Sequence, residues 1–172
     1  MFRSLLACAA ALSLLAGAAQ AQTVLMVRHA EKAAEPAGDP PLTAAGQARA
    51  EALSAMLNGL PIGAIISSDT LRTRSTAEPL SRRTGVAVTR VPLSAGLEKH
   101  LADTVAAVRA APKNKAVIVV GHSNTVPEIA RALGQAAPAP IADCKYDGLY
   151  VARLGGATPS FAQMTYGAAS AC

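Results

Sequence analysis

The sequence contains no tryptophan, only three tyrosines and two phenylalanines, and no long run of basic residues. These few aromatic residues are not interleaved with basic ones, which argues against a nucleic-acid-binding protein. No H-x-H pair, paired carboxylates or Cys/His cluster has the spacing of metal ligands, so neither a metal nor another cofactor is expected. Internal repeats and low-complexity tracts are also lacking.

No apolar run has the length of about 20 residues that a comfortable membrane span requires. The longest such run, residues 5–16, follows Arg3 and precedes Ala19-Gln20-Ala21, a small-x-small cleavage site. This pattern predicts a secretory signal peptide over residues 1–21, with an uncleaved anchor as the alternative. We therefore expect a periplasmic or secreted protein, with a single domain over residues 22–172 that is long enough for a sizeable core.

Cysteine is scarce, and Cys8 would be removed with the signal peptide. An exported protein that retains only Cys144 and Cys172 is expected to join them in a disulfide that holds the C-terminus, although two unrelated thiols are the alternative. Loss of Arg3 lowers the formal net charge from +5 to +4. This modest positive excess favours anionic ligands.

Short apolar runs alternate with segments of helical periodicity along the chain. The predicted strands cover residues 23–27, 64–66, 86–91, 116–120, 149–154 and 161–165. The predicted helices begin at a Thr43 cap, an Asp69 cap, residue 101 and a capping box at Thr125-Val126-Pro127-Glu128, and residues 135–141 form a loop. This order predicts an α/β fold with three layers, α/β/α, around a mostly parallel central sheet.

Three of the predicted strands end on residues that suit anion chemistry. The first ends on Arg28-His29, the second is followed by Arg72 one turn into a helix, and the strongest ends on Gly121-His122. The carboxyl ends of parallel strands meet at one edge of a sheet, where ligands bind in open α/β folds. We therefore expect the two histidines and two arginines to share a pocket.

This set of residues suits phosphoryl transfer, in which negative charge on three equatorial oxygens needs fixed positive donors. Arg28 and Arg72 can supply forked contacts to phosphate, and His122 can supply a further donor. His29 would act as the in-line nucleophile and form a phosphohistidine that water then hydrolyses. Each residue taken alone has an ordinary structural role as its alternative.

The motifs that carry these residues resemble those of the histidine phosphatase superfamily, also called phosphoglycerate mutase-like. The similar segments are Val27-Arg28-His29-Ala30-Glu31 (R-H-G-E), Leu42-Thr43-Ala44-Ala45-Gly46 (L-T-x-x-G), Ser68-Asp69-Thr70-Leu71-Arg72 with Thr76-Ala77 (S-D-x-x-R-x-x-x-T-A), and Gly121-His122-Ser123-Asn124 (the late G-H). Their order and spacing match over about residues 23–154, with Ala30 in place of the usual glycine. The resemblance implies a phosphoglycerate mutase-like fold with His29 as the phosphorylated nucleophile. It also implies Arg28, Arg72 and His122 as the phosphate pocket.

The proton donor and the remaining substrate contacts come from weaker patterns. Gly96-Leu97-Glu98-Lys99-His100 resembles the L-x-E-R-H of the mutases and nominates Glu98 as the acid, with a solvated carboxylate at a helix start as the alternative. Glu31 is a second candidate for the acid. His100 has no evident partner and is expected at the surface. The residues expected to contact substrate beyond the phosphate pocket are Glu31, Lys32, Ser123 and Asn124.

The sequence thus predicts a small exported phosphomonoesterase that acts on a small phosphorylated substrate through His29. One alternative is a non-catalytic periplasmic module that binds phosphate or a partner on the same fold, because fold alone does not imply activity. The other is a phosphohistidine-protein phosphatase, whose size the chain matches but whose cytoplasmic substrates an exported protein would not meet. Neither the substrate nor the oligomeric state follows from the sequence.

Overall fold

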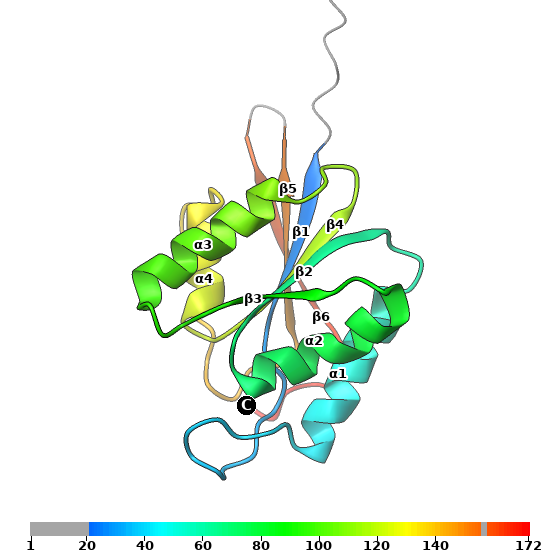
Figure 1. The fold of residues 1–172 in the computed structure, drawn as a ribbon, viewed down its shortest axis with the longest axis vertical. Helices are drawn as coiled ribbons and strands as arrows, with labels where there is room; N and C mark the ends of the chain where they lie inside the picture. The colour runs from blue at the N-terminus through cyan, green and yellow to red at the C-terminus, as the bar shows by residue number, and fades with distance from the viewer. Residues whose placement is uncertain (1–20, 156–157) are drawn as a thin grey trace, which may run out of the picture.

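The computed structural model describes residues 21–155 and 158–172 (Figure 1). The predicted signal peptide, apart from Ala21, and Cys8 lie outside these residues. Strands and helices alternate in the order β1 (Gln22–Arg28), α1 (Ala44–Met56), β2 (Ile62–Ser68), α2 (Leu71–Thr84), β3 (Val88–Val91), α3 (Leu97–Ala110), β4 (Ala116–Gly121), α4 (Thr125–Ala132), β5 (Gly148–Leu154) and β6 (Ser160–Thr165). Within the described ranges, none of the helices combines the length and apolar character needed to span a membrane.

The strands form one sheet in the order β3-β2-β4-β1-β5-β6. The first four strands in this order are mutually parallel, whereas β5 is antiparallel to β1 and β6 is antiparallel to β5. Parallel neighbours need a long crossover, and each of these crossovers carries a helix, while β5 and β6 are joined by a short connection that permits only antiparallel pairing. The predicted α/β fold with a mostly parallel sheet is confirmed.

Helices cover both faces of the sheet, with α1 and α2 on one side and α3 and α4 on the other (Figure 1). The central strand β4 is buried along its whole length, as its unbroken apolar run predicts. Its alternate residues divide between two cores: Val117 and Val119 pack with the α3 and α4 side chains, and Ile118 and Val120 with those of α1 and α2.

The predicted start of α1 is confirmed, but that of α2 is wrong. The Thr43 hydroxyl accepts the Gly46 N–H at 3.1 Å. In α2, however, Thr70 is the N-cap residue, and the Leu71 N–H donates to the two carboxylate oxygens of Asp39, at 2.8 and 2.9 Å. Asp69 instead accepts the N–H of Leu93. A carboxylate 32 residues away has displaced the local cap, which a local pattern cannot reveal.

Two further predictions are corrected on the other face of the sheet. Helix α4 begins at Thr125 after an Asn124 N-cap, and the Thr125 hydroxyl accepts the His122 N–H at 2.8 Å, so the predicted capping box does not form. Helix α3 begins four residues before the predicted position, which turns His100 into the core. His100 is 2% exposed, and its Nδ1 donates to the Val91 carbonyl at 3.1 Å, contrary to the surface position expected.

The predicted disulfide is present between Cys144 and Cys172, whose Cα atoms are 5.3 Å apart. The bridge joins the last residue of the chain to the segment that precedes β5, and the intervening residues contain both antiparallel strands. The C-terminus is therefore held to the body of the protein near the start of β5.

A close backbone approach explains why glycine occupies the first turn of α1. A Cβ atom on Gly46 would lie 2.2 Å from the carbonyl oxygen of Glu31, two residues beyond His29. The same carbonyl accepts the Thr43 N–H at 2.9 Å. Only a residue without a side chain allows the start of α1 to pack against the segment that follows β1.

We therefore expect Gly46→Ala to lower the free energy of unfolding by about 2 kcal/mol, because relieving the clash requires backbone movement. This loss should occur even though alanine favours helix over glycine by about 1 kcal/mol. Urea denaturation measures the difference. The matched control is Gly38→Ala, because nothing lies within 4 Å of a Cβ at that position. Equal stability of the two variants would contradict the interpretation.

Candidate active site

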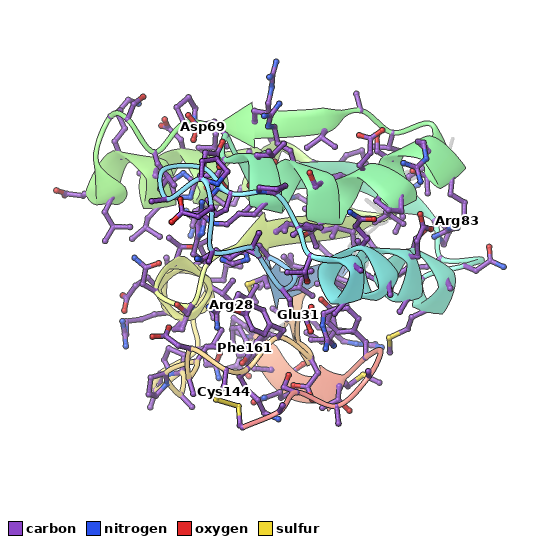
Figure 2. The ribbon with its side chains drawn as sticks, turned by 90° about the horizontal axis from the view of Figure 1, so that it is seen from below. Arg28, Glu31, Asp69, Arg83, Cys144 and Phe161 are labelled. Atoms are coloured by element: carbon purple, nitrogen blue, oxygen red, sulfur yellow. A yellow bond between two sulfur atoms is a disulfide. The ribbon has the colours of Figure 1, made fainter. Side chains whose placement is uncertain are left out.

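The carboxyl ends of the parallel strands bring the two predicted histidines together. Arg28 at the end of β1 lies opposite Gly121 at the end of β4, and the His29 N–H donates to the Gly121 carbonyl at 2.9 Å. His29 and His122 each follow their strand directly, so their rings meet edge to face with centroids 5.4 Å apart. Figure 2 views this end of the sheet, with Arg28 and Glu31 near its middle.

His29 has the tautomer and the charge state of a nucleophile. Its Nδ1 lies 2.8 Å from the carbonyl oxygen of Ala30, which can only accept, so Nδ1 carries the proton and Nε2 keeps its lone pair. The side chain is 4% exposed. Burial, assisted by the positive charges of Arg28, Arg72 and Lys32 and opposed by the bond to Ala30, lowers the pKa of His29 from 6.5 to about 4. The imidazole is therefore neutral at pH 7.

His122 is held by a chain of hydroxyl groups from the end of β2 and the start of α2. Its Nε2 lies 2.8 Å from the Ser68 hydroxyl, which lies 2.8 Å from the Thr73 hydroxyl. Burial, followed by the repulsion that a protonated His29 would exert and by the charge of Arg72, lowers the pKa of His122 to about 3. A bound phosphate dianion would oppose this shift, because a nearby negative charge favours the protonated imidazole.

Both arginines of the predicted pocket have a buried Nε–H without a hydrogen-bond partner among the described residues. The Arg28 Nη1 is already engaged by backbone carbonyls, and Nη1 of Arg72 lies 3.5 Å from Asp39. Leaving a buried charged donor unpaired is costly. The two Nε–H groups are therefore available as donors to an anion. The charges of the same two guanidinium groups lower the pKa values of both histidines.

The Glu31 side chain, which the sequence predicted to contact substrate, forms a salt bridge with Arg49. Nε and Nη2 of the buried Arg49 donate to its carboxylate, with a shortest distance of 2.7 Å. Burial raises the pKa of Glu31, but the hydrogen bonds and charge of Arg49 outweigh this effect and lower it. The pair fastens the segment after His29 to α1, which is a positioning role.

The other predicted substrate residues occupy different surroundings. Lys32 is exposed, and its charge contributes to the low pKa of His29. Ser123 is half-buried and Asn124 is exposed directly after His122. Glu98 is exposed in the first turn of α3, and no hydrogen bond or ion pair joins it to the four pocket residues in the part of the chain described.

Two residues near the pocket were missed by sequence reasoning. The carboxylate of Asp39 lies beside Arg72, and the ring of Tyr146 lies 4.2 Å from the guanidinium carbon of Arg28 and 6.1 Å from the His29 ring. Both come from segments that the sequence marks only as loops, and their contacts cross more than 30 residues of chain. No local signal identifies either of them.

The two buried histidines should make the fold sensitive to acid. Their folded pKa values lie below the unfolded value of about 6.5, so the unfolded state binds more protons, and stability is lost as the pH falls below 6.5 towards the folded values. Between pH 7 and pH 5 we expect each histidine to account for a loss of about 2 kcal/mol in unfolding free energy. Urea denaturation of the wild type and of His29→Asn/His122→Asn at both pH values measures this. Equal acid sensitivity of the two proteins would contradict the assignment.

Comparison with known proteins connects this geometry to one family. The model of the histidine phosphatase superfamily (branch 1) matches residues 24–98, a segment that includes Arg28, His29 and Arg72. No curated protein matches the sequence.

Solved structures share the fold over most of the chain. A tungstate complex of the protein histidine phosphatase SixA is 20% identical with a TM-score of 0.64, covering 83% of this chain and 96% of that one. A putative phosphohistidine phosphatase SixA from Agrobacterium tumefaciens is 25% identical with a TM-score of 0.58, covering 85% and 97%. A putative alpha-ribazole-5'-P phosphatase from Escherichia coli is 16% identical with a TM-score of 0.65, covering 84% and 96%.

The matched segment, the shared fold and the pocket geometry agree with the histidine phosphatase superfamily. This agreement supports phosphatase activity in general for the chain. Residues 24–98 of this chain therefore match the histidine phosphatase superfamily (branch 1), and the chain shares its fold with the solved SixA structures.

Proposed function

We propose that this protein is a phosphomonoesterase that hydrolyses phosphate esters through a phosphohistidine on His29. The observation that carries the proposal is a neutral, buried His29 whose Nδ1–H is bound to the Ala30 carbonyl, beside two guanidinium groups with unpaired Nε–H donors. A site that only bound phosphate would need the donors but not a nucleophilic lone pair. This difference favours an enzyme over a non-catalytic binding module.

The reaction proceeds in two displacements at phosphorus. In the first, Nε2 of His29 bonds to phosphorus as the ester P–O bond breaks, and the leaving alkoxide takes a proton from an acid. In the second, water attacks phosphorus, loses its proton to the same group, and the P–N bond breaks to release phosphate. Arg28 and Arg72 stabilise the charge on the equatorial oxygens, and His122, once protonated beside the dianion, donates a further hydrogen bond.

We propose the acid that protonates the leaving group from the positions of acidic side chains relative to the pocket arginines. Asp39 and Asp143 are the acidic side chains that form ion pairs with the pocket arginines in the described ranges, with Asp39 3.5 Å from Arg72 and Asp143 3.9 Å from Arg28. Asp143 is almost fully exposed. Glu98, nominated by the sequence, has no such contact. We therefore assign the acid to Asp39 and retain Glu98 as the residue to test against it.

The likeness to SixA structures favours a second candidate, a phosphohistidine-protein phosphatase. The chain spans 96–98% of three such structures at 20–25% identity, so it has their size. Export remains a proposal based on residues 1–21, and it would separate the protein from cytoplasmic phosphoproteins. Comparing the hydrolysis of a phosphohistidine-containing protein with that of small phosphate esters by the same preparation decides between the two.

His29→Ala should reduce the hydrolysis of p-nitrophenyl phosphate by at least about a thousandfold, because it removes the covalent step. Wild-type protein quenched during turnover should carry phosphate that is labile in acid and stable in alkali, and the variant should carry none. Vanadate, a mimic of the trigonal phosphoryl group, should inhibit the wild type.

The matched controls for this experiment lie on α2. Arg72→Ala should weaken substrate binding, whereas Arg82→Ala, which loses only surface ion pairs to Glu51 and Glu78, should not. Phosphate binding by the wild type without any turnover would refute the enzyme and support the binding module.

The assignment of the acid predicts a dependence on the leaving group. Asp39→Asn should slow the hydrolysis of an alkyl phosphate about tenfold or more and that of p-nitrophenyl phosphate much less, because nitrophenolate leaves without a proton. Glu98→Gln should resemble Asp103→Asn, a control that loses a surface ion pair to Lys99 on the same helix. A selective loss in Glu98→Gln, with Asp39→Asn unaffected, would reverse the assignment.

A further inference from the structure

We propose that the disulfide between Cys144 and Cys172 positions Arg28 for phosphate binding, so that its reduction weakens the site without unfolding the protein. This inference rests on the proposed function, because it assigns a means of regulation to the same pocket. Three observations support the inference. They are the contacts that orient the Arg28 guanidinium, the contacts that hold the segment making them, and the exposure of the disulfide to reductants.

The orientation of Arg28 is set by a segment outside its own strand. Its Nη1 donates to the carbonyls of Ala142, Asp143 and Lys145, at 3.0, 2.7 and 3.2 Å. The Tyr146 ring packs on the guanidinium at 4.2 Å. Nη2 lies 3.5 Å from the Tyr146 hydroxyl and 3.9 Å from the Asp143 carboxylate. With both terminal nitrogens engaged by this segment, the unpaired Nε–H is the donor left for an anion. The three carbonyls belong to residues on either side of Cys144 in the chain. The disulfide is therefore attached to the segment that orients Arg28.

This orienting segment, residues 142–147, contains no helix or strand and is held largely by the end of the chain. The Ser170 hydroxyl accepts the N–H groups of Tyr146 and Asp147, at 2.9 and 3.1 Å, and the Ser170 N–H donates to the Asp147 carboxylate at 3.1 Å. Two residues later, Cys172 is bonded to Cys144. The disulfide and the Ser170 contacts therefore act as one clamp, which we call the C-terminal clamp.

The buried Tyr166 donates its N–H to the Asp147 carbonyl at 3.0 Å, but residues 167–172 beyond it lack regular structure. We therefore expect the covalent bond at Cys172 to restrain Ser170 within hydrogen-bonding range. Neither cysteine belongs to the buried core clusters. The sheet also continues through β5 and β6 with six paired positions that do not involve the clamp. Opening the bridge should thus release the orienting segment and leave the core intact.

Both cysteines are exposed, which makes the bridge accessible to a dithiol. In the reaction, the S–S bond accepts two electrons and two protons to give two thiols, and the dithiol is oxidised to its own disulfide. The oxidised protein then has an oriented Arg28 and the reduced protein a freer one. Activity would follow the redox state of the surroundings.

The test compares p-nitrophenyl phosphate hydrolysis and vanadate inhibition before and after treatment with dithiothreitol, with a thiol count that rises by two. We expect KM and the vanadate inhibition constant to rise about tenfold, and kcat to change less, because Arg28 binds the phosphoryl group in the ground state as well as in the transition state. Reoxidation should restore both. Cys144→Ser/Cys172→Ser should have the reduced values and no response to dithiothreitol.

A second variant keeps the disulfide and weakens the rest of the clamp. Ser170→Ala removes the acceptor of two N–H groups and should raise KM about threefold. Ser160→Ala, at the exposed start of β6, is its matched control and should match the wild type. These readouts separate positioning of Arg28 from general stability, provided that circular dichroism shows the same folded content in each protein.

The failure of this inference is distinguishable from failure of the proposed function. Unchanged KM and vanadate inhibition after complete reduction would overturn the clamp and leave the phosphatase intact. Unfolding on reduction would also overturn it, because the bridge would then support the whole fold. Absence of turnover in the oxidised protein would contradict the proposed function. In that case, vanadate affinities measured by calorimetry for the oxidised and the reduced protein would still test the clamp.

Discussion

The site depends on the burial of two neutral imidazoles beside two cationic guanidinium groups with unpaired donors. Burial keeps His29 and His122 uncharged at neutral pH, and the neighbouring positive charges reinforce this effect. The same burial leaves the Nε–H groups of Arg28 and Arg72 without partners in the described ranges. In the proposed function, a phosphoryl dianion would accept hydrogen bonds from these donors and lie within reach of the lone pair of His29. The site is therefore matched to an anion before any ligand arrives.

Such a site needs support, because each of its parts is unfavourable alone. The segment after His29 is fastened by the Glu31–Arg49 pair and by the close approach of Gly46, and the Ala30 N–H donates to the Thr76 hydroxyl of α2 at 2.9 Å. His122 is fastened through its backbone by Thr125 and through its ring by Ser68. These contacts join helices from both faces of the sheet to the strand ends, so the layers of the fold and the geometry of the pocket stabilise each other.

Arg28 differs from the other pocket residues because irregular backbone orients it. The C-terminal clamp supplies the carbonyls and the aromatic face that hold its guanidinium. The six paired positions of β5 and β6 do not involve this clamp, whereas the contacts that orient Arg28 lie within it. Under the proposed function, the protein would combine a nucleophile held by buried strands with a phosphate-binding arginine whose placement depends on a disulfide at the surface.

The sequence by itself predicted where these strands end, because short apolar runs such as those before His29 and His122 are typical of buried strands, and parallel strands share one edge. The Thr43 cap and the Cys144–Cys172 pair are likewise local or compositional features. Only the tertiary structure decided which carboxylate lies beside Arg72, that His100 is buried, that Glu31 pairs with Arg49, and that Tyr146 packs on Arg28. Those contacts join segments through loop geometry or helix register, and such long-range partners leave no periodic or local mark in the chain.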